Sequence, residues 1–256
     1  MNCLTCFELT TALLLAPAAF AQSAPPQVGP TQHPALFLVG DSIVKTGDGN
    51  GEKGPWGNLG GRSSRGYIEE GGWAKILDRL QPADYVFIRF GHNDAANSQN
   101  YPDRMTLKGN GDETTETEWP VTHNKETIHT YGWYLRQYVQ ETKAKGATPI
   151  VCSPVPRNTW IDGKIKRGFD GYATWAAAAS RQSGAQFIDL NTLTADRYDA
   201  LDRENAASYF NDAQHTTKAG AQLNAAALVE GLKSLDCPLS NFLVAANLAR
   251  AATGLV

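Results

Sequence analysis

Four short apolar runs, separated by longer amphipathic stretches, constrain the fold of this 256-residue chain more than any other feature. The runs are Ala35–Val39, Tyr85–Phe90, Thr148–Cys152 and Gln186–Leu190. Their apolar residues are continuous rather than alternating, which is typical of strands that are covered on both faces. Because helical patterns lie between several of the runs, we expect a parallel sheet in an α/β domain.

The stretches between the runs carry apolar residues at the three- and four-residue spacing of helices. The predicted helices cover Trp73–Leu80, Ile128–Thr142, Tyr172–Ser183 and Leu223–Leu228, with a weaker stripe over residues 239–250. Residues 95–123 are polar and poorly patterned. A long irregular insertion in a compact domain is usually functional or mobile, so we expect this segment to be one of the two.

The N-terminal residues have the pattern of a signal peptide. Leu9–Ala19 is an apolar stretch too short to span a bilayer, and Ala19-Phe20-Ala21 matches a cleavage site, although the preceding residues include Glu8 and no lysine or arginine. A buried helix and a mis-assigned start codon are the alternatives. We therefore expect a signal peptide over 1–21, a flexible lead-in over 22–34, one domain over 35–256, and a secreted or periplasmic protein.

Charge and composition exclude several classes of protein. The formal net charge of −3 argues against a nucleic-acid-binding surface. No run of about 18 apolar residues occurs, so no membrane span is predicted. The residues after the predicted cleavage site lack the spacing of a zinc site, and we expect neither a metal nor a cofactor. The two cysteines that follow it, Cys152 and Cys237, are expected as free thiols, with a disulfide between them as the alternative.

Polar residues follow the first two apolar runs where the predicted strands end. Gly40-Asp41-Ser42 follows the first run, and Gly91-His92-Asn93-Asp94 follows the second. In parallel sheets, active groups gather at the carboxyl ends of the strands. Ser42 can serve there as a nucleophile, although turn and cap serines are common at such places. The amide of Asn93 can donate to a developing oxyanion, or it can form an Asx turn.

Asp212 and His215 lie three residues apart near the C-terminal end of the chain. A carboxylate at this spacing can orient one ring nitrogen and leave the other free to take a proton from a hydroxyl. The alternative is a polar loop that caps the following helix. Gly61 can offer its backbone N–H to the same oxyanion as Asn93, or it can be a plain turn glycine.

These four blocks occur in the order that characterises the SGNH (GDSL-type) hydrolase superfamily, which the sequence resembles. Flanking segments such as Gly60–Arg65, Asp84–Asp94, His129–Arg136 and Ser153–Asn158 look like those of the rhamnogalacturonan acetylesterase family of carbohydrate esterases. The resemblance covers roughly residues 35–232. It implies a single three-layer α/β/α, flavodoxin-like domain that acts as a serine esterase.

The resemblance also implies a role for each block. Ser42 attacks the ester carbonyl, His215 takes the serine proton, and Asp212 orients His215. The backbone N–H groups of Ser42 and Gly61 and the side chain of Asn93 form the oxyanion hole. Water then hydrolyses the acyl-enzyme.

The segment 43–60 departs from the family pattern. In the family, a helix and a second strand precede the glycine of the second block, whereas only 18 glycine-rich residues separate Ser42 from Gly61 here. A βαβ unit needs about 30 residues or more. We therefore expect the helix and the second strand to be missing, the first strand to lie at the edge of the sheet, and a loop to place Gly61.

The substrate implied by the resemblance is an acetylated pectic polysaccharide. Arg62, Arg65 and Arg157 are candidates for contacts with its carboxylates, because guanidinium groups pair with carboxylates, while solvated surface charges are the alternative. An acetylxylan or broad small-ester esterase is the second hypothesis. A weakened enzyme or a non-catalytic carbohydrate-binding remnant is the third, because of the shortened segment. The sequence leaves the oligomeric state open.

Overall fold

The computed structural model describes residues 34–44, 61–95, 103–118, 123 and 125–243. The predicted signal peptide and all of the lead-in except Pro34 lie outside the described residues, so those two predictions are not tested. Most of the shortened segment, residues 45–60, lies outside them as well.

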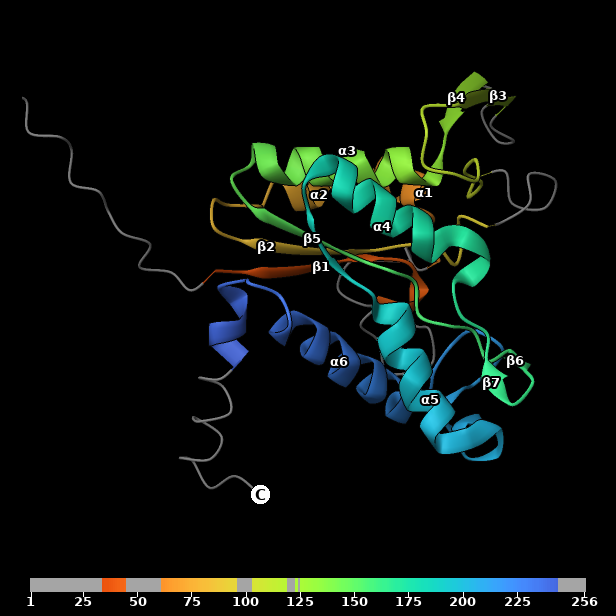
Figure 1. Ribbon diagram of the computed structural model, residues 1–256. Coiled ribbons are helices and arrows are strands. Elements are labelled where there is room, and N and C mark those ends of the chain that lie inside the picture. The colour runs from red at the N-terminus through yellow and green to blue at the C-terminus, as the bar shows by residue number, and fades with distance from the viewer. Residues whose placement is uncertain (1–33, 45–60, 96–102, 119–122, 124, 244–256) are drawn as a thin grey trace, which may run out of the picture. The chain divides into compact units, whose positions relative to one another are not determined.

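A four-stranded parallel sheet forms the centre of the described chain (Figure 1). Its strands are β1 (Leu36–Gly40), β2 (Tyr85–Arg89), β5 (Thr148–Cys152) and β8 (Gln186–Ile188), in the order β1-β2-β5-β8. The register pairs Leu36 with Tyr85 and Gly40 with Arg89. All four strands fall on the predicted apolar runs, which confirms the parallel α/β sheet.

Helices cover both faces of this sheet (Figure 1). On one face lie α1 (Ser64–Glu69), α2 (Gly72–Leu77), α3 (Tyr131–Ala144) and α4 (Tyr172–Ser183). Their apolar side chains, Leu135 and Val139 among them, form one core with Val86 and Ile88. On the other face, α5 (Leu190–Ala206) and α6 (Lys218–Lys233) pack against Phe87 and Ile150. The predicted three-layer arrangement is therefore present.

The predicted helix over Ile128–Thr142 begins too early. Ile128 lies in the strand β4 (Lys125–His129), which pairs with β3 (Thr114–Glu118) as an antiparallel hairpin. The helix α3 starts only after Thr130, whose hydroxyl accepts a hydrogen bond from the N–H of Trp133 at 3.1 Å and so caps it. The hairpin also gives part of the polar insertion a regular structure.

The helix α5 was not predicted, and Leu190 belongs to it rather than to the preceding strand. The helix carries many polar residues, so its apolar stripe is weak. It is started by Asp189, whose carboxylate accepts a hydrogen bond from the N–H of Thr192 at 3.2 Å. The remaining short elements are the 3-10 turns η1 (Ser42–Val44), η2 (Phe169–Gly171) and η3 (Ala207–Tyr209) and the strands β6 (Trp160–Ile161) and β7 (Lys164–Ile165).

The strand β1 lies at the edge of the sheet in the part of the chain that the structure describes, as predicted. Its one partner there is β2, and Leu36 and Leu38 are 47% and 50% exposed. The prediction that a helix and a strand are missing from 43–60 is not tested, because residues 45–60 lie outside the described residues.

The structure also bears on the predicted absence of a membrane span and on the state of the two cysteines. None of the described helices is long and apolar enough to cross a membrane. Cys152 and Cys237 are free thiols, and both are buried in the core on the α5–α6 side of the sheet.

The burial of Cys152 leads to a test of this core. Burial raises the pKa of its thiol to about 12, despite the opposing charge of Arg89. Because only the thiolate is alkylated, iodoacetamide at pH 8 should modify Cys152 at least about 100-fold more slowly in the native protein than in urea. Peptide mapping by mass spectrometry measures this ratio. Rapid native labelling, or a peptide cross-linked to Cys237, would contradict the packing.

Candidate active site

The turn after β1 places Ser42 at the carboxyl end of the sheet. Gly40 is required there because a Cβ atom would lie 2.2 Å from the carbonyl oxygen of Arg89 in the neighbouring strand. The chain then turns sharply through η1, where the N–H of Val44 donates to the carbonyl of Asp41 at 3.2 Å. Ser42 is the first residue of this turn, and its side chain is partly exposed.

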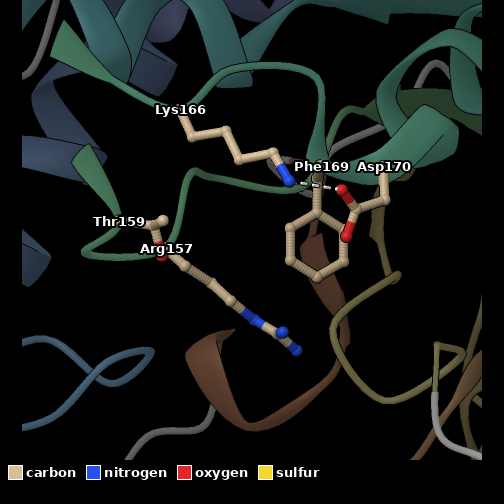
Figure 2. Close-up of a pocket in the computed structure, with 5 residues that line it drawn as sticks. All are labelled: Arg157, Thr159, Lys166, Phe169 and Asp170. Atoms are coloured by element: carbon tan, nitrogen blue, oxygen red, sulfur yellow. Dashed lines mark hydrogen bonds and ion pairs between the residues drawn. The ribbon is translucent and has the colours of Figure 1, made fainter. Parts of the chain in front are cut away.

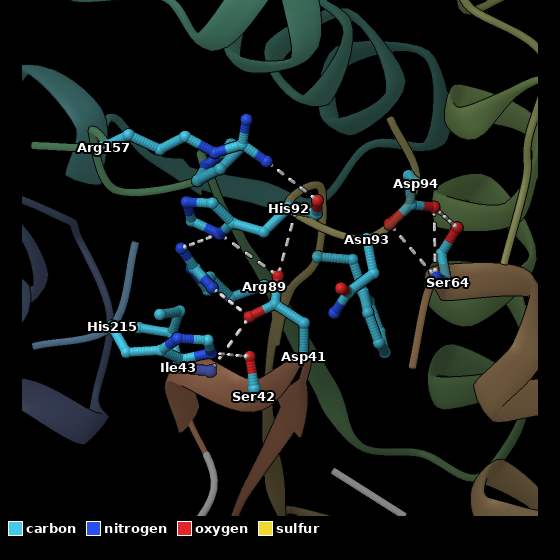
Figure 3. Close-up of polar contacts among 12 residues, drawn as sticks. Asp41, Ser42, Ile43, Ser64, Arg89, His92, Asn93, Asp94, Arg157 and His215 are labelled. Carbon is cyan, nitrogen blue, oxygen red and sulfur yellow. Dashed lines mark hydrogen bonds and ion pairs between the residues drawn. The ribbon is translucent and has the colours of Figure 1, made fainter. Parts of the chain in front are cut away.

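The structure brings Ser42, His215 and Asp212 together (Figure 3 shows the first two). The hydroxyl oxygen of Ser42 lies 3.0 Å from Nε2 of His215. Nδ1 of His215 lies 2.8 Å from one carboxylate oxygen of Asp212. The residues are 173 positions apart for the first contact and three for the second, so the fold itself creates the first.

Backbone hydrogen bonds fix Asp212 relative to His215. Its second carboxylate oxygen accepts from the N–H of His215 at 2.6 Å and from the N–H of Gln214 at 2.7 Å. Slight burial acts to raise the pKa of Asp212, but these bonds and the imidazole outweigh it and lower the pKa to about 2. Asp212 is therefore a carboxylate at neutral pH. The side chains of His215 and Asp212 are 47% and 55% exposed, so the pair lies at the surface.

A buried carboxylate, that of Asp41, lies directly behind the serine (Figure 3). One of its oxygens accepts from the guanidinium of Arg89 and from the N–H of Ile43 at 3.1 Å. The other accepts from the N–H of His92 at 3.2 Å. Burial alone would raise the pKa of Asp41, but Arg89 and His92 hold it well below its ordinary value. This one charged group therefore ties the serine turn to the turn after β2.

The imidazole of His92 is neutral at physiological pH. Burial and the charge of Arg89 lower its pKa to about 4, although Asp41 acts in the opposite direction. Nδ1 of His92 lies 2.7 Å from Nη2 of Arg89, which can only donate, and 3.3 Å from a carboxylate oxygen of Asp41, which can only accept. We assign Nδ1 as the acceptor because its contact with Arg89 is the shorter of the two, and this assignment places the proton on Nε2. The ring packs against that of Phe169, with centroids 4.6 Å apart.

Asn93 and Gly61, the two other predicted oxyanion donors, lie in neighbouring segments. The amide nitrogen of Asn93 is 3.4 Å from the carbonyl oxygen of Arg62, the residue after Gly61. Gly61 has a φ of +82°, a left-handed conformation that favours glycine. The structure thus brings the second and third blocks side by side, as the prediction required.

Of the three arginines predicted to contact substrate, Arg65 does not fit that role. Its side chain is fully buried, and its guanidinium is 3.0 Å from the carboxylate of Glu126 and 3.7 Å from that of Glu69. The helix α1 turns it toward the insertion hairpin instead of the solvent. Arg62 is partly exposed, but its Nε is 2.6 Å from the carboxylate of Glu70, so its charge is already paired.

Sequence reasoning did not assign a role to Asp41, Arg89 or His92. A charged residue at the end of an otherwise apolar strand, as Arg89 is, is the signal that was available, because a buried charge needs a partner. Within the described residues, no group of three or more His, Cys, Asp or Glu side chains is arranged to hold a metal ion.

Comparisons with known proteins identify the family of the chain. The model of the GDSL-like Lipase/Acylhydrolase family matches residues 38–223. A rhamnogalacturonan acetylesterase from Emericella nidulans is 31% identical over 242 residues, which cover 89% of this chain and 90% of the relative. A probable rhamnogalacturonan acetylesterase from Bacillus subtilis is 30% identical over 231 residues, which cover 82% of this chain and 97% of the relative.

Solved structures share the fold. An acetylxylan esterase from Geobacillus stearothermophilus has a TM-score of 0.52 and 17% identity, over 77% of this chain and 93% of that one. Three other structures of that enzyme are catalytic mutants in which alanine replaces a serine, an aspartate or a histidine. A Bacillus subtilis protein has a TM-score of 0.60 and 22% identity, over 80% of this chain but 57% of that one. These likenesses confirm the predicted α/β fold class.

The buried carboxyl group of Asp94, next to Asn93, leads to a pH test. Burial raises its pKa to about 7, although the N–H and the hydroxyl of Ser64 both donate to it. In the unfolded chain the group titrates near pH ~4. Between these two values the folded protein holds a proton that the unfolded chain has lost, so the free energy of unfolding falls as the pH rises.

The Asp94→Asn variant has no carboxyl group at this position, so this group cannot lower its free energy of unfolding as the pH rises. The difference in melting temperature, wild type minus variant, should therefore shrink between pH 5 and pH 8. Circular dichroism melts at the two pH values measure it, and contributions from all other groups cancel in the difference. A difference that stays constant or grows with pH would show that the carboxyl group is already ionised at pH 5.

Proposed function

The chain belongs to the GDSL-like lipase/acylhydrolase family and is a carboxylic ester hydrolase, and we propose that it removes acetyl groups from a pectic polysaccharide. The observation that carries the chemistry is the continuous contact from Ser42 through His215 to Asp212. A hydroxyl, an imidazole and a carboxylate in this order form the arrangement that activates a serine nucleophile.

The proposed reaction has two halves. Nε2 of His215 takes the proton of Ser42 as its oxygen attacks the acetyl carbonyl, and the protonated ring then gives a proton to the departing sugar hydroxyl. Asp212 is ionised, so it holds Nδ1–H and stabilises the positive ring. Water, activated by the same imidazole, then hydrolyses the acetyl-serine and releases acetate.

The negative charge on the carbonyl oxygen needs donors that are already in place. We assign this role to the backbone N–H groups of Ser42 and Gly61 and to the amide of Asn93. What supports the assignment is the contact between Asn93 and the Gly61-Arg62 segment, together with the shared anchor Asp41 behind both turns.

The proposed substrate rests on relatives that span nearly all of the chain. Two proteins with 30–31% identity are named as rhamnogalacturonan acetylesterases, one of them as probable. Deacetylation of xylan is the second candidate, because a solved acetylxylan esterase shares the fold and its catalytic mutants replace the same three residue types. Export of the protein is proposed from the pattern of residues 1–21, and it fits a polymer that is too large to enter a cell.

The nucleophile is tested by replacing its hydroxyl. The Ser42→Ala variant should lose at least about 10⁴-fold in kcat on p-nitrophenyl acetate, because the attacking atom is gone. Ser234→Ala removes a hydroxyl that bonds within the last turn of α6 and should retain wild-type rates. Acetate release from acetylated rhamnogalacturonan and from acetylxylan then separates the two substrates. Equal rates for wild type and Ser42→Ala would overturn the proposed mechanism.

The anchor behind the nucleophile is tested with a matched pair of variants. Asp84 is also buried and also ties β1 to its surroundings, but at the opposite end, where it accepts from the N–H of Ala35 at 2.7 Å. Asp84→Asn should lower the free energy of unfolding by about 1–3 kcal/mol. Asp41→Asn should lower it by about 3–5 kcal/mol, because it leaves the buried Arg89 without its charged partner. We expect kcat to fall about tenfold or more only in Asp41→Asn, because only this variant loosens the serine and Asn93 turns. Parallel losses of kcat in both variants would make Asp41 a purely structural residue.

A further inference from the structure

A small hollow of about 110 Å³ lies at the loop that carries Arg157 (Figure 2). It is lined by Arg157, Thr159, Lys166, Phe169 and Asp170. Its volume equals that of three or four water molecules, which suits one charged end of a sugar residue rather than a whole ring. Neither the proposed hydrolysis nor its oxyanion donors use any of these side chains.

The loop that carries Arg157 touches both halves of the candidate active site. Nη2 of Arg157 donates to the carbonyl of His92 at 3.3 Å, one residue before the proposed oxyanion donor (Figure 3). The N–H of the next residue, Asn158, donates to the carbonyl of Ala213 at 2.9 Å, between Asp212 and His215. A ligand in the hollow would therefore be held within one or two residues of the reacting groups.

Positive charge exceeds negative charge around the hollow. Nζ of Lys166 lies 2.7 Å from the carboxylate of Asp170, so these two charges offset each other. The hydrogen bond from Lys166 is the largest influence that lowers the pKa of Asp170, and the charges of Lys166, Arg157 and Lys108 add to it. Three cations thus act on one carboxylate, which leaves an excess of positive charge for an anionic ligand.

The backbone that presents Phe169 and Asp170 is strained. Both residues are left-handed, with φ of 45° and 54°, between Gly168 and Gly171, which are left-handed as well. Such conformations in non-glycine residues are uncommon and cluster at ligand-binding sites. The ring of Phe169 lies against Arg157, whose Cζ is 4.7 Å from the ring centroid. The guanidinium is therefore oriented before any ligand arrives.

Two buried nitrogen atoms on this side of the site lack hydrogen-bond partners among the described residues. They are Nε of Arg157, which always carries a proton, and Nε2 of His92, which carries one in the tautomer assigned above; of the two residues, Arg157 lines the hollow. Unused buried donors are costly, and an anion is the ligand that satisfies donors without adding new ones.

We propose that the hollow at Arg157 and Lys166 is a subsite for the carboxylate of an acidic sugar residue, bound while a nearby acetylated residue of the same polymer lies at Ser42. The inference rests on the proposed function and deepens it, because it makes a uronate the feature by which the enzyme selects its polymer. Asp170 then acts as a tuning residue that weakens the subsite by occupying Lys166.

The test is direct binding to the full-length Ser42→Ala protein, which cannot turn over substrate. Calorimetry compares de-esterified oligogalacturonides with neutral xylo-oligosaccharides of the same length. In this background, Lys166→Gln should weaken oligogalacturonide binding about threefold to tenfold, and Asp170→Asn should strengthen it by a similar factor. Asparagine tolerates the left-handed backbone at position 170, so the second variant keeps the loop. Binding of the neutral oligomers should change less than twofold in both.

The control is Lys75→Gln, which removes an exposed lysine on α2 and should leave oligogalacturonide binding as it is. Raising NaCl from 20 to 200 mM should weaken that binding in the reference protein and weaken it less in Lys166→Gln. Shifts of the same sign in Lys166→Gln and Asp170→Asn, or no shift in either, would overturn the subsite. Hydrolysis of p-nitrophenyl acetate by the wild type is scored separately, so a failed subsite and a failed esterase give different results.

Discussion

The carboxylate of Asp41 is the group on which the geometry of the site depends. It is buried and charged, and it accepts hydrogen bonds from two turns that follow different strands. Its partner Arg89 is the last residue of the inner strand β2. Both side chains are buried, so burying either charge without the other would destabilise the fold. The two turns that carry Ser42 and Asn93 are therefore held by the same carboxylate, each through one of its oxygens. A movement of one turn relative to the other has to break a hydrogen bond to Asp41.

A second buried carboxyl group, that of Asp94, lies on the other side of Asn93 and behaves differently. Asp41 has a guanidinium beside it and stays ionised, whereas Asp94 accepts hydrogen bonds from the N–H and hydroxyl of Ser64 but is buried without such a cation, and its pKa is raised. The contrast shows that burial alone does not set the charge of a carboxyl group. What matters is whether a cation is buried with it. Asn93 thus lies between one carboxylate that stays charged and one carboxyl group whose pKa is raised to about 7.

Much of the architecture was predictable from the sequence, because the apolar runs and the helical stripes report local patterns that burial on two faces imposes. The triad contacts were predictable in kind from Ser42 and the Asp212-x-x-His215 spacing. The hairpin around Ile128 and the helix after Asp189 were not, since their residues are largely polar and their structure comes from a cap or from cross-strand pairing. The burial of Arg65 was not predictable for a similar reason. It depends on an ion pair with Glu126, which lies 61 positions away in the sequence. The roles of Arg89 and His92 depend on Asp41, a residue about 50 positions away, which no local pattern reports.

The surface position of the imidazole and its carboxylate, each about half exposed, has a consequence for how a long polymer is approached. A recessed nucleophile admits only chain ends or detached monomers, so an enzyme with that design must wait for other enzymes to cut. In the function proposed above, the exposed imidazole and carboxylate would let a glycan strand lie across the site from the side. Acetyl groups in the interior of an intact strand would then be as accessible as those at its termini, and their removal would not depend on prior depolymerisation.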